Sequence, residues 1–174
     1  MKQKIQIRCK NNKKSQKVEI GSTLFDVFSS FDLKMTHGPV SARVNNKVEG
    51  MHYRVYNSKD VEFLDMNSAS GSRAYTRTLF FVLCKAVQDI YPNTDVVIDI
   101  PVSNGFYVDI RLGRPVVDED VNILRRRMQE IIDSKIPIRR FTVPTEEAIA
   151  LFQEKGDVEK VKLLKTSGSI YTTY

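Results

Sequence analysis

The chain has 174 residues, of which 41% are hydrophobic and 28% charged, and a formal net charge of +6. This length permits one large domain or two small ones, and the composition is typical of a folded protein rather than a disordered one. No apolar run reaches the roughly 18 residues of a membrane span, and no apolar signal core follows Met1, so we expect a cytoplasmic protein without membrane contact. Two cysteines and two histidines are too few for a disulfide framework or a His-rich zinc site, so we expect no metal.

The first 66 residues show the alternation of short strands around one helix. This pattern predicts strands over 4–10 and 17–20, and Ser22 is placed to cap the helix that follows. The apolar stripe of this helix consists of Leu24, Val27, Phe28 and Phe31. Short strands over 40–44 and 61–64 complete an order that predicts one helix packed across a small mixed sheet.

The small and polar residues 67–72 predict a linker between a domain over 1–66 and a second domain over 73–174. The second domain begins with a helix over 73–91, whose broad apolar face predicts burial on more than one side. The elements expected after it are strands over 96–100 and 105–110, a helix from Asp118 or Asp120, a strand over 138–143, and short helices over 145–155 and 157–164. The predicted fold class is α+β.

Three stretches resemble parts of two domains of known families. Val18–Val27 (VEIGSTLFDV) and Ala42–Val48 (ARVNNKV) resemble a TGS domain, the β-grasp (ubiquitin-like) unit of threonyl-tRNA synthetase, certain GTPases and guanosine-tetraphosphate synthetases. Ile98–Asp109 (IDIPVSNGFYVD) resembles the strand pair of the editing domain that follows TGS in threonyl-tRNA synthetase. The resemblance covers nearly the whole chain and implies a β-grasp domain followed by an editing-like α+β domain.

The chain departs from that family at its catalytic histidines. In the family, a His-x-x-x-His pair on the first long helix of the editing domain positions water and holds the mischarged 3′ end of tRNA. Counting back from Pro92, these positions fall on Arg77 and Phe81. Arginine stays protonated at neutral pH and phenylalanine exchanges no proton, so neither serves as a general base. We therefore expect no catalytic residue here.

A degenerate pocket can still bind a ligand. The candidate ligand-binding residues are Arg77, Asn104 and Tyr107, since a guanidinium suits a phosphate or nucleotide. The alternative, which the apolar helix face favours, is that Phe81 fills the core and Arg77 is an exposed helix residue.

The stretch Val161–Tyr174 resembles the corresponding part of bacterial nucleoside kinases of the uridine kinase type. Those proteins carry a TGS unit and a degenerate editing-like domain ahead of a P-loop kinase domain. The resemblance implies a truncated editing-like domain, a downstream kinase domain in cis, and ATP and Mg²⁺ as cofactors of that domain. The phosphate-binding loop motif is absent from these residues, so we expect a non-catalytic accessory or regulatory module without its own cofactor.

Two other functions stay open. The first is a working tRNA-editing module of a threonyl-tRNA synthetase, which hydrolyses mischarged Ser-tRNA. The second is a protein-interaction module that dimerises through the broad face of the 73–91 helix.

Five arginines are candidates for contact with RNA or a nucleotide. They are Arg125, Arg126, Arg127, Arg139 and Arg140. Clustered guanidinium groups form the electrostatic footprint of a phosphate-binding surface. The alternative is a solvated helix face, with Glu119, Glu130 and Asp133 as ion-pair partners.

Overall fold

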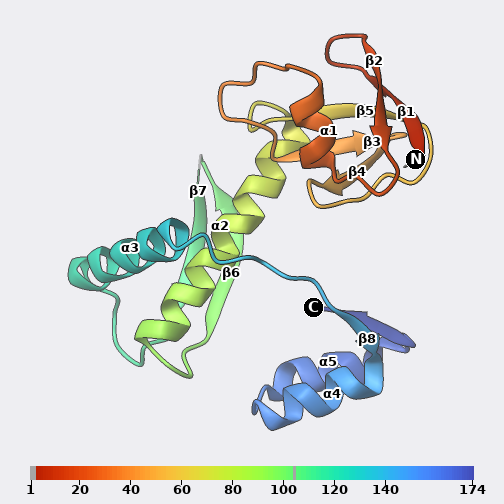
Figure 1. Ribbon diagram of the computed structural model, residues 1–174. Helices are drawn as coiled ribbons and strands as arrows, with labels where there is room; N and C mark the ends of the chain where they lie inside the picture. Colours follow the sequence, from red (N-terminus) through yellow and green to blue (C-terminus); the bar gives the residue numbers. More distant parts are fainter. Residues whose placement is uncertain (1–2, 104) are drawn as a thin grey trace. The chain divides into compact units, whose positions relative to one another are not determined.

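The computed structural model describes residues 3–103 and 105–174, and its elements confirm the predicted α+β class (Figure 1). The chain divides into two compact units, Met1–Asp133 and Ser134–Tyr174. The division between domains at 67–72, by contrast, stays a prediction.

The first unit contains a five-stranded mixed sheet with the strand order β2-β1-β5-β3-β4. Its strands are β1 (Lys4–Cys9), β2 (Ser15–Glu19), β3 (Ser41–Val44), β4 (Lys47–Gly50) and β5 (Lys59–Leu64). The central pair β1–β5 is parallel, and the pairs β1–β2, β3–β4 and β3–β5 are antiparallel. Helix α1 (Leu24–Ser30) supplies the other side of the core.

The core between α1 and this sheet is closely packed. Its fully buried side chains include Ile7, Leu24, Val27, Val61 and Phe63. These residues stand at the alternate strand positions and the helical stripe predicted from the sequence. Phe28 lies at the margin of this core, with its ring 5.1 Å from that of Phe63 in an edge-on arrangement.

Helix α1 is capped by Thr23 and not by Ser22, so the predicted cap was wrong by one residue. The Thr23 hydroxyl accepts a hydrogen bond from the Asp26 amide at 3.2 Å, and the Thr23 amide donates to the Asp26 carboxylate at 2.8 Å. This reciprocal arrangement requires an acidic or amide side chain three residues after the cap, and Asp26 satisfies that spacing only for Thr23.

Helix α2 (Ala69–Ile90) begins four residues earlier than predicted. Ser68 caps it by accepting a hydrogen bond from the Gly71 amide at 3.0 Å while its own hydroxyl donates to the Asp65 carbonyl at 2.8 Å. The residues expected to form a linker therefore include the first turn of this helix. Serine and glycine are common in linkers, but serine is also a preferred helix cap.

The remaining elements of the first unit pack on the C-terminal half of α2. They are β6 (Val96–Val102), β7 (Gly105–Ile110) and α3 (Asp118–Asp133), with β6 and β7 paired antiparallel. The buried residues of this second core are Ala86, Val87, Leu124 and Ile131. Helix α2 is more open than its apolar face predicts, because Tyr75 is 40% exposed and Phe81 is 66% exposed.

The second unit has two short helices and a short strand pair. Its elements are β8 (Thr142–Pro144), α4 (Thr145–Glu154), α5 (Val158–Ser167) and β9 (Tyr171–Thr173). The strand predicted over 138–143 is shorter in the structure. In the described chain, only the end of that segment, as part of β8, pairs with β9. Asp157 caps α5 as expected, by accepting a hydrogen bond from the Lys160 amide at 3.0 Å.

Gly71 is required by a close approach at the start of α2. A Cβ atom at this position would lie 1.8 Å from the Asp65 carbonyl oxygen. Substitution of Gly71→Ala is therefore expected to destabilise the first unit by about 1–3 kcal/mol, since the backbone clash exceeds the ~1 kcal/mol gain in helix propensity. Urea denaturation followed by circular dichroism measures the change.

Gly50→Ala is the matched control, because nothing lies within 4 Å of a Cβ at that position. We expect its effect to stay within about 0.5 kcal/mol. Equal stability of the two variants would contradict the close approach.

Candidate functional site

A groove of about 490 Å³ lies between the first half of α2 and the tip of the β6–β7 hairpin. Its lining residues on α2 are Ser72, Arg73, Thr76, Arg77 and Phe80, and those on the hairpin are Pro101, Ser103, Gly105 and Phe106. Arg73 and Arg77 are four residues apart, so both guanidinium groups stand on one face of the helix. The groove thus combines positive charge with an aromatic wall.

The aromatic wall is made by Phe80 of α2 and Phe106 of β7. Their ring centroids are 5.0 Å apart and the ring planes are nearly perpendicular, at 87°. Phe106 is 45% exposed, so part of its ring faces the groove. An open aromatic ring beside guanidinium groups is suited to a nucleotide, because bases stack on the ring and phosphates pair with arginine.

Of the predicted site residues that the structure describes, one lines this groove. Arg77 is exposed and lines it, whereas Phe81 and Tyr107 do not. Tyr107 follows Phe106 on β7 and therefore points to the other face of the hairpin. Asn104 lies outside the described residues. Phe81, at 66% exposure, does not fill the core, so the interpretation of Phe81 as a core residue was wrong.

Arg73, Phe80 and Phe106 are groove residues that the sequence analysis did not select. The i, i+4 spacing of the two arginines was visible in the sequence. The pairing of Phe80 with Phe106 was not, because it depends on the register between α2 and the hairpin.

Among the described residues that line the groove, none is suited to general-base catalysis. Both histidines of the chain, His37 and His52, precede α2 in the sequence. No acidic side chain or cysteine is among the groove-lining residues. In the described part of the chain, no three His, Cys, Asp or Glu side chains are grouped so that they could hold a metal ion. The described lining residues can bind an anionic ligand, but they include no proton acceptor that titrates near neutral pH.

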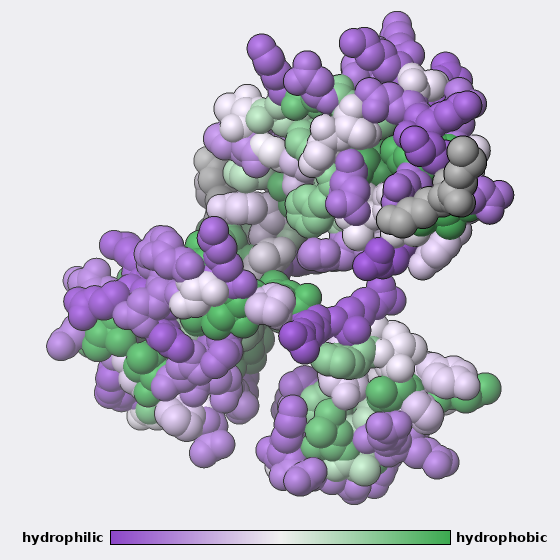
Figure 2. Space-filling view, in the orientation of Figure 1, coloured by the Kyte–Doolittle hydropathy of each residue, from purple (hydrophilic) through white to green (hydrophobic). Residues whose placement is uncertain are grey.

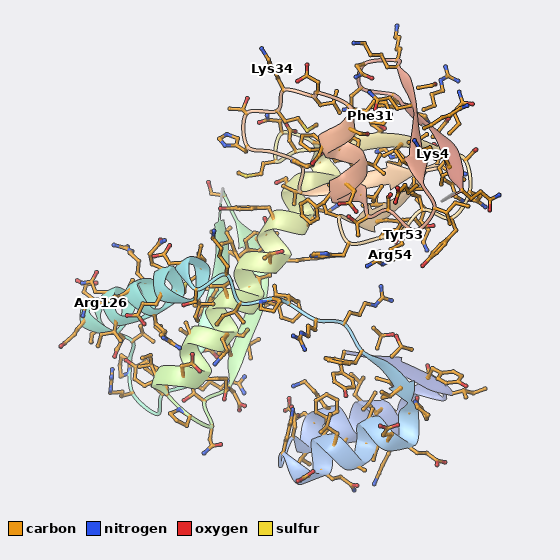
Figure 3. The ribbon with its side chains drawn as sticks, viewed as in Figure 1. Lys4, Phe31, Lys34, Tyr53, Arg54 and Arg126 are labelled. Atoms are coloured by element: carbon orange, nitrogen blue, oxygen red, sulfur yellow. The ribbon has the colours of Figure 1, made fainter. Side chains whose placement is uncertain are left out.

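The three consecutive arginines of α3 have three different environments. Arg127 is fixed: it donates to Asp89 at 2.8 and 3.0 Å and to Glu130 at 2.8 Å, and these bonds raise its pKa. Arg126 is exposed on α3 (Figure 3). Arg125 lines a separate apolar cleft. Successive residues of a helix point about 100° apart, so the three guanidinium groups leave α3 in different directions.

Arg139 and Arg140 are exposed and precede β8. They belong to the second unit, and the arginines of α3 belong to the first. A shared RNA surface of all five arginines therefore stays a prediction.

A buried ionic network fixes the start of α3. Asp120 is 3% exposed and accepts both guanidinium hydrogen bonds of Arg114 at 2.7 Å, the Tyr91 hydroxyl at 2.6 Å and the Val117 amide at 3.0 Å. These donors, with Arg114 the strongest, hold the pKa of the Asp120 carboxyl well below its usual range. The hydrogen bond that its hydroxyl donates to Asp120 raises the pKa of Tyr91. With four hydrogen bonds and an ion pair satisfied, this carboxylate is structural.

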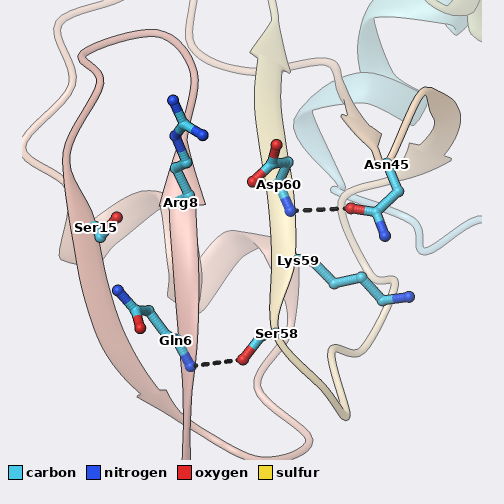
Figure 4. A pocket seen from close by; sticks show the side chains of 7 residues that line it. All are labelled: Gln6, Arg8, Ser15, Asn45, Ser58, Lys59 and Asp60. Carbon is cyan, nitrogen blue, oxygen red and sulfur yellow. Dashed lines mark hydrogen bonds between the residues drawn. The ribbon is translucent and has the colours of Figure 1, made fainter.

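A third hollow, of about 320 Å³, lies on the first sheet (Figure 4). Two of its polar groups are already occupied by hydrogen bonds between neighbouring segments. The Ser58 hydroxyl accepts a hydrogen bond from the backbone amide of Gln6 at 3.3 Å, and the Asn45 side-chain oxygen accepts one from the backbone amide of Asp60 at 3.0 Å. These bonds link strand edges, and the hollow has no aromatic side chain in its lining.

Comparison with known proteins relates most of the chain to one class of enzyme. No family model matches it. It is 30% identical over 145 residues to the threonine–tRNA ligase of Acetivibrio thermocellus, which covers 83% of this chain and 23% of the ligase. It is 29% identical over 161 residues to the threonine–tRNA ligase of Clostridium kluyveri, and this match covers 92% of this chain and 25% of the ligase.

A similar match, 26% identical over 154 residues, is found with the threonine–tRNA ligase of Methylococcus capsulatus. The chain thus spans about a quarter of the length of the curated relatives it matches. None of the described helices is both long and apolar enough to cross a membrane.

The Asp120 network gives a pH-dependent prediction. A carboxyl whose pKa is lowered by folding stabilises the protein above its unfolded pKa of about 3.9 and loses that contribution as the pH falls towards the folded value. We expect Asp120→Asn to lower the melting temperature clearly between pH 5 and 8, and the difference from wild type to shrink as the pH falls below about 4.

Differential scanning calorimetry over this pH range measures the effect, with Asp118→Asn as a control. Asp118 lies in the same first turn but is exposed. A difference that does not vary with pH, or one that is equal in both variants, would contradict the role of the ionised Asp120.

Proposed function

We propose that the chain is a tRNA-binding module of the threonyl-tRNA synthetase type, which holds the 3′ end of a tRNA in the groove of Arg73, Arg77, Phe80 and Phe106 without hydrolysing it. The observation that carries the proposal is the similarity of 82–92% of the chain to threonine–tRNA ligases. This similarity favours the synthetase-related interpretation over the nucleoside kinase interpretation.

The fold supports the same proposal. The sheet order β2-β1-β5-β3-β4, with a parallel central pair and a single packed helix, is the order expected of a β-grasp TGS domain. The long helix α2 followed by the β6–β7 hairpin matches the order of elements in an editing-like domain. We infer that the editing-like domain occupies the part of the chain after Ser68.

The chemistry of the groove supports binding rather than hydrolysis. Two guanidinium groups and a partly open ring fit the phosphates and a base of a single-stranded end. Hydrolysis of an ester needs a group that activates water, and the groove lining offers none. The catalytic part of such an enzyme would then lie in another domain in cis. The kinase domain, with its ATP and Mg²⁺, stays a prediction from the resemblance of Val161–Tyr174.

Binding at the groove is tested with an unmodified threonine tRNA transcript and the same transcript shortened by its last three nucleotides. We expect Arg73→Ala and Arg77→Ala each to weaken binding of the full transcript about tenfold. Each substitution should also make the slope of log K against log salt less negative by about 0.7. Fluorescence anisotropy at several salt concentrations measures both quantities.

Arg126→Ala is the matched control, because it removes an exposed arginine outside the groove. The shortened transcript should bind wild type and the groove variants equally. Loss of affinity in Arg126→Ala alone would place the RNA surface on α3 and contradict the groove as the site.

The absence of a general base predicts no deacylase activity. We expect Ser-tRNA incubated with the chain to lose its serine no faster than in buffer alone, over the pH range 6 to 8. The assay follows release of labelled serine. Turnover above the buffer rate would show that the chain is a working editing module.

A further inference from the structure

A second hollow of the first unit is almost entirely apolar. This cleft, of about 500 Å³, is bounded by α2, β7, the segment before α3, and α3 itself. Its lining residues are Leu83, Val108, Ile110, Val116, Val121, Leu124, Arg125 and Met128. Apolar surface is visible below α3 in Figure 2. The volume lies in the range of sites for small organic ligands, which are also largely apolar with few polar groups.

The cleft has a buried floor and an open rim. Leu124 at its base is 4% exposed, and it belongs to the core that α2 and α3 share. Val116 and Val121 at the rim are 41% and 44% exposed. An uncovered apolar rim above a packed floor is costly in water, so a ligand that covers it gains free energy in proportion to the area removed from water.

Arg125 is the single charged side chain among the described residues that line the cleft. Its neighbour Arg127 is tied to Asp89 and Glu130, whereas the described residues give Arg125 no acidic partner. An apolar cavity with one cation at its margin is complementary to a molecule that has an apolar body and one anionic end. A guanidinium forms two parallel hydrogen bonds with a carboxylate.

We propose that this cleft binds an amphipathic small molecule with a single anionic group, such as an acyl or aryl carboxylate. The apolar body lies on Leu83, Val108 and Met128, and the anionic end pairs with Arg125. This assigns Arg125 to a site separate from the groove on the other half of α2, and the proposal does not depend on tRNA binding.

The probes are 8-anilinonaphthalene-1-sulfonate, which is apolar with one anionic group, and the pair dodecanoate and dodecanol. We expect the fluorescence of the first to rise on binding at one site per chain and to be reversed by dodecanoate below its micelle concentration. Wild type should bind dodecanoate about tenfold more tightly than dodecanol, because only the acid pairs with the guanidinium.

Arg125→Gln should abolish this preference while keeping the affinity for dodecanol. Arg126→Gln, its exposed neighbour on the same helix, should leave both affinities unchanged. Val121→Glu places a carboxylate at the rim and should weaken the binding of all three probes more than tenfold, and circular dichroism verifies that this variant is folded.

Three results would overturn the proposal. The first is that no probe binds. The second is that neither Arg125→Gln nor Val121→Glu alters the binding. The third is that light scattering shows a dimer which Val121→Glu dissociates. The last would mean that a second copy of the chain covers the cleft.

Discussion

Ala86 and Val87 of α2 are fully buried in a core that they share with Leu124 and Ile131 of α3, and the apolar cleft beside Arg125 is built on that core. Alanine and valine are short, so the two helices approach closely, and the β6–β7 hairpin completes the same core through Val96 and Ile110. A two-stranded hairpin is marginal by itself in water. Because the β6–β7 hairpin is attached to α2, one end of the hairpin lies beside Arg77 and the other beside Met128.

The sequence predicted the elements of the first sheet and its core well. Ile7, Leu24 and Val27 are buried as the alternation and helical spacing require, because those patterns are local properties of the chain. The start of α2 was missed, since serine and glycine are typical of linkers and their role as cap and close-contact residue depends on the Asp65 carbonyl. Strand β9 was missed because it exists only through its pairing with β8.

The site was predicted less completely than the fold. Arg77 could be selected from a motif, but Phe106 reaches the groove through a tertiary contact that no local pattern encodes. The Arg125–Arg127 run suggested one surface because its residues are adjacent in the sequence, and that surface stays a prediction. On a helix, neighbouring side chains diverge, so one arginine lines an apolar cleft, one faces water and one closes an ion pair with Asp89.

The second unit differs from the first in how little it buries. In the described residues, Thr145 and Ala148 of α4 are its buried side chains, α5 has none, and Leu163 is 67% exposed. Local stability follows the amount of buried apolar contact, and segments with little of it open without unfolding the rest. We therefore expect α5 to open at a lower free energy than the first sheet, so that amide hydrogens of α5 exchange with solvent sooner than those of β1 and β5.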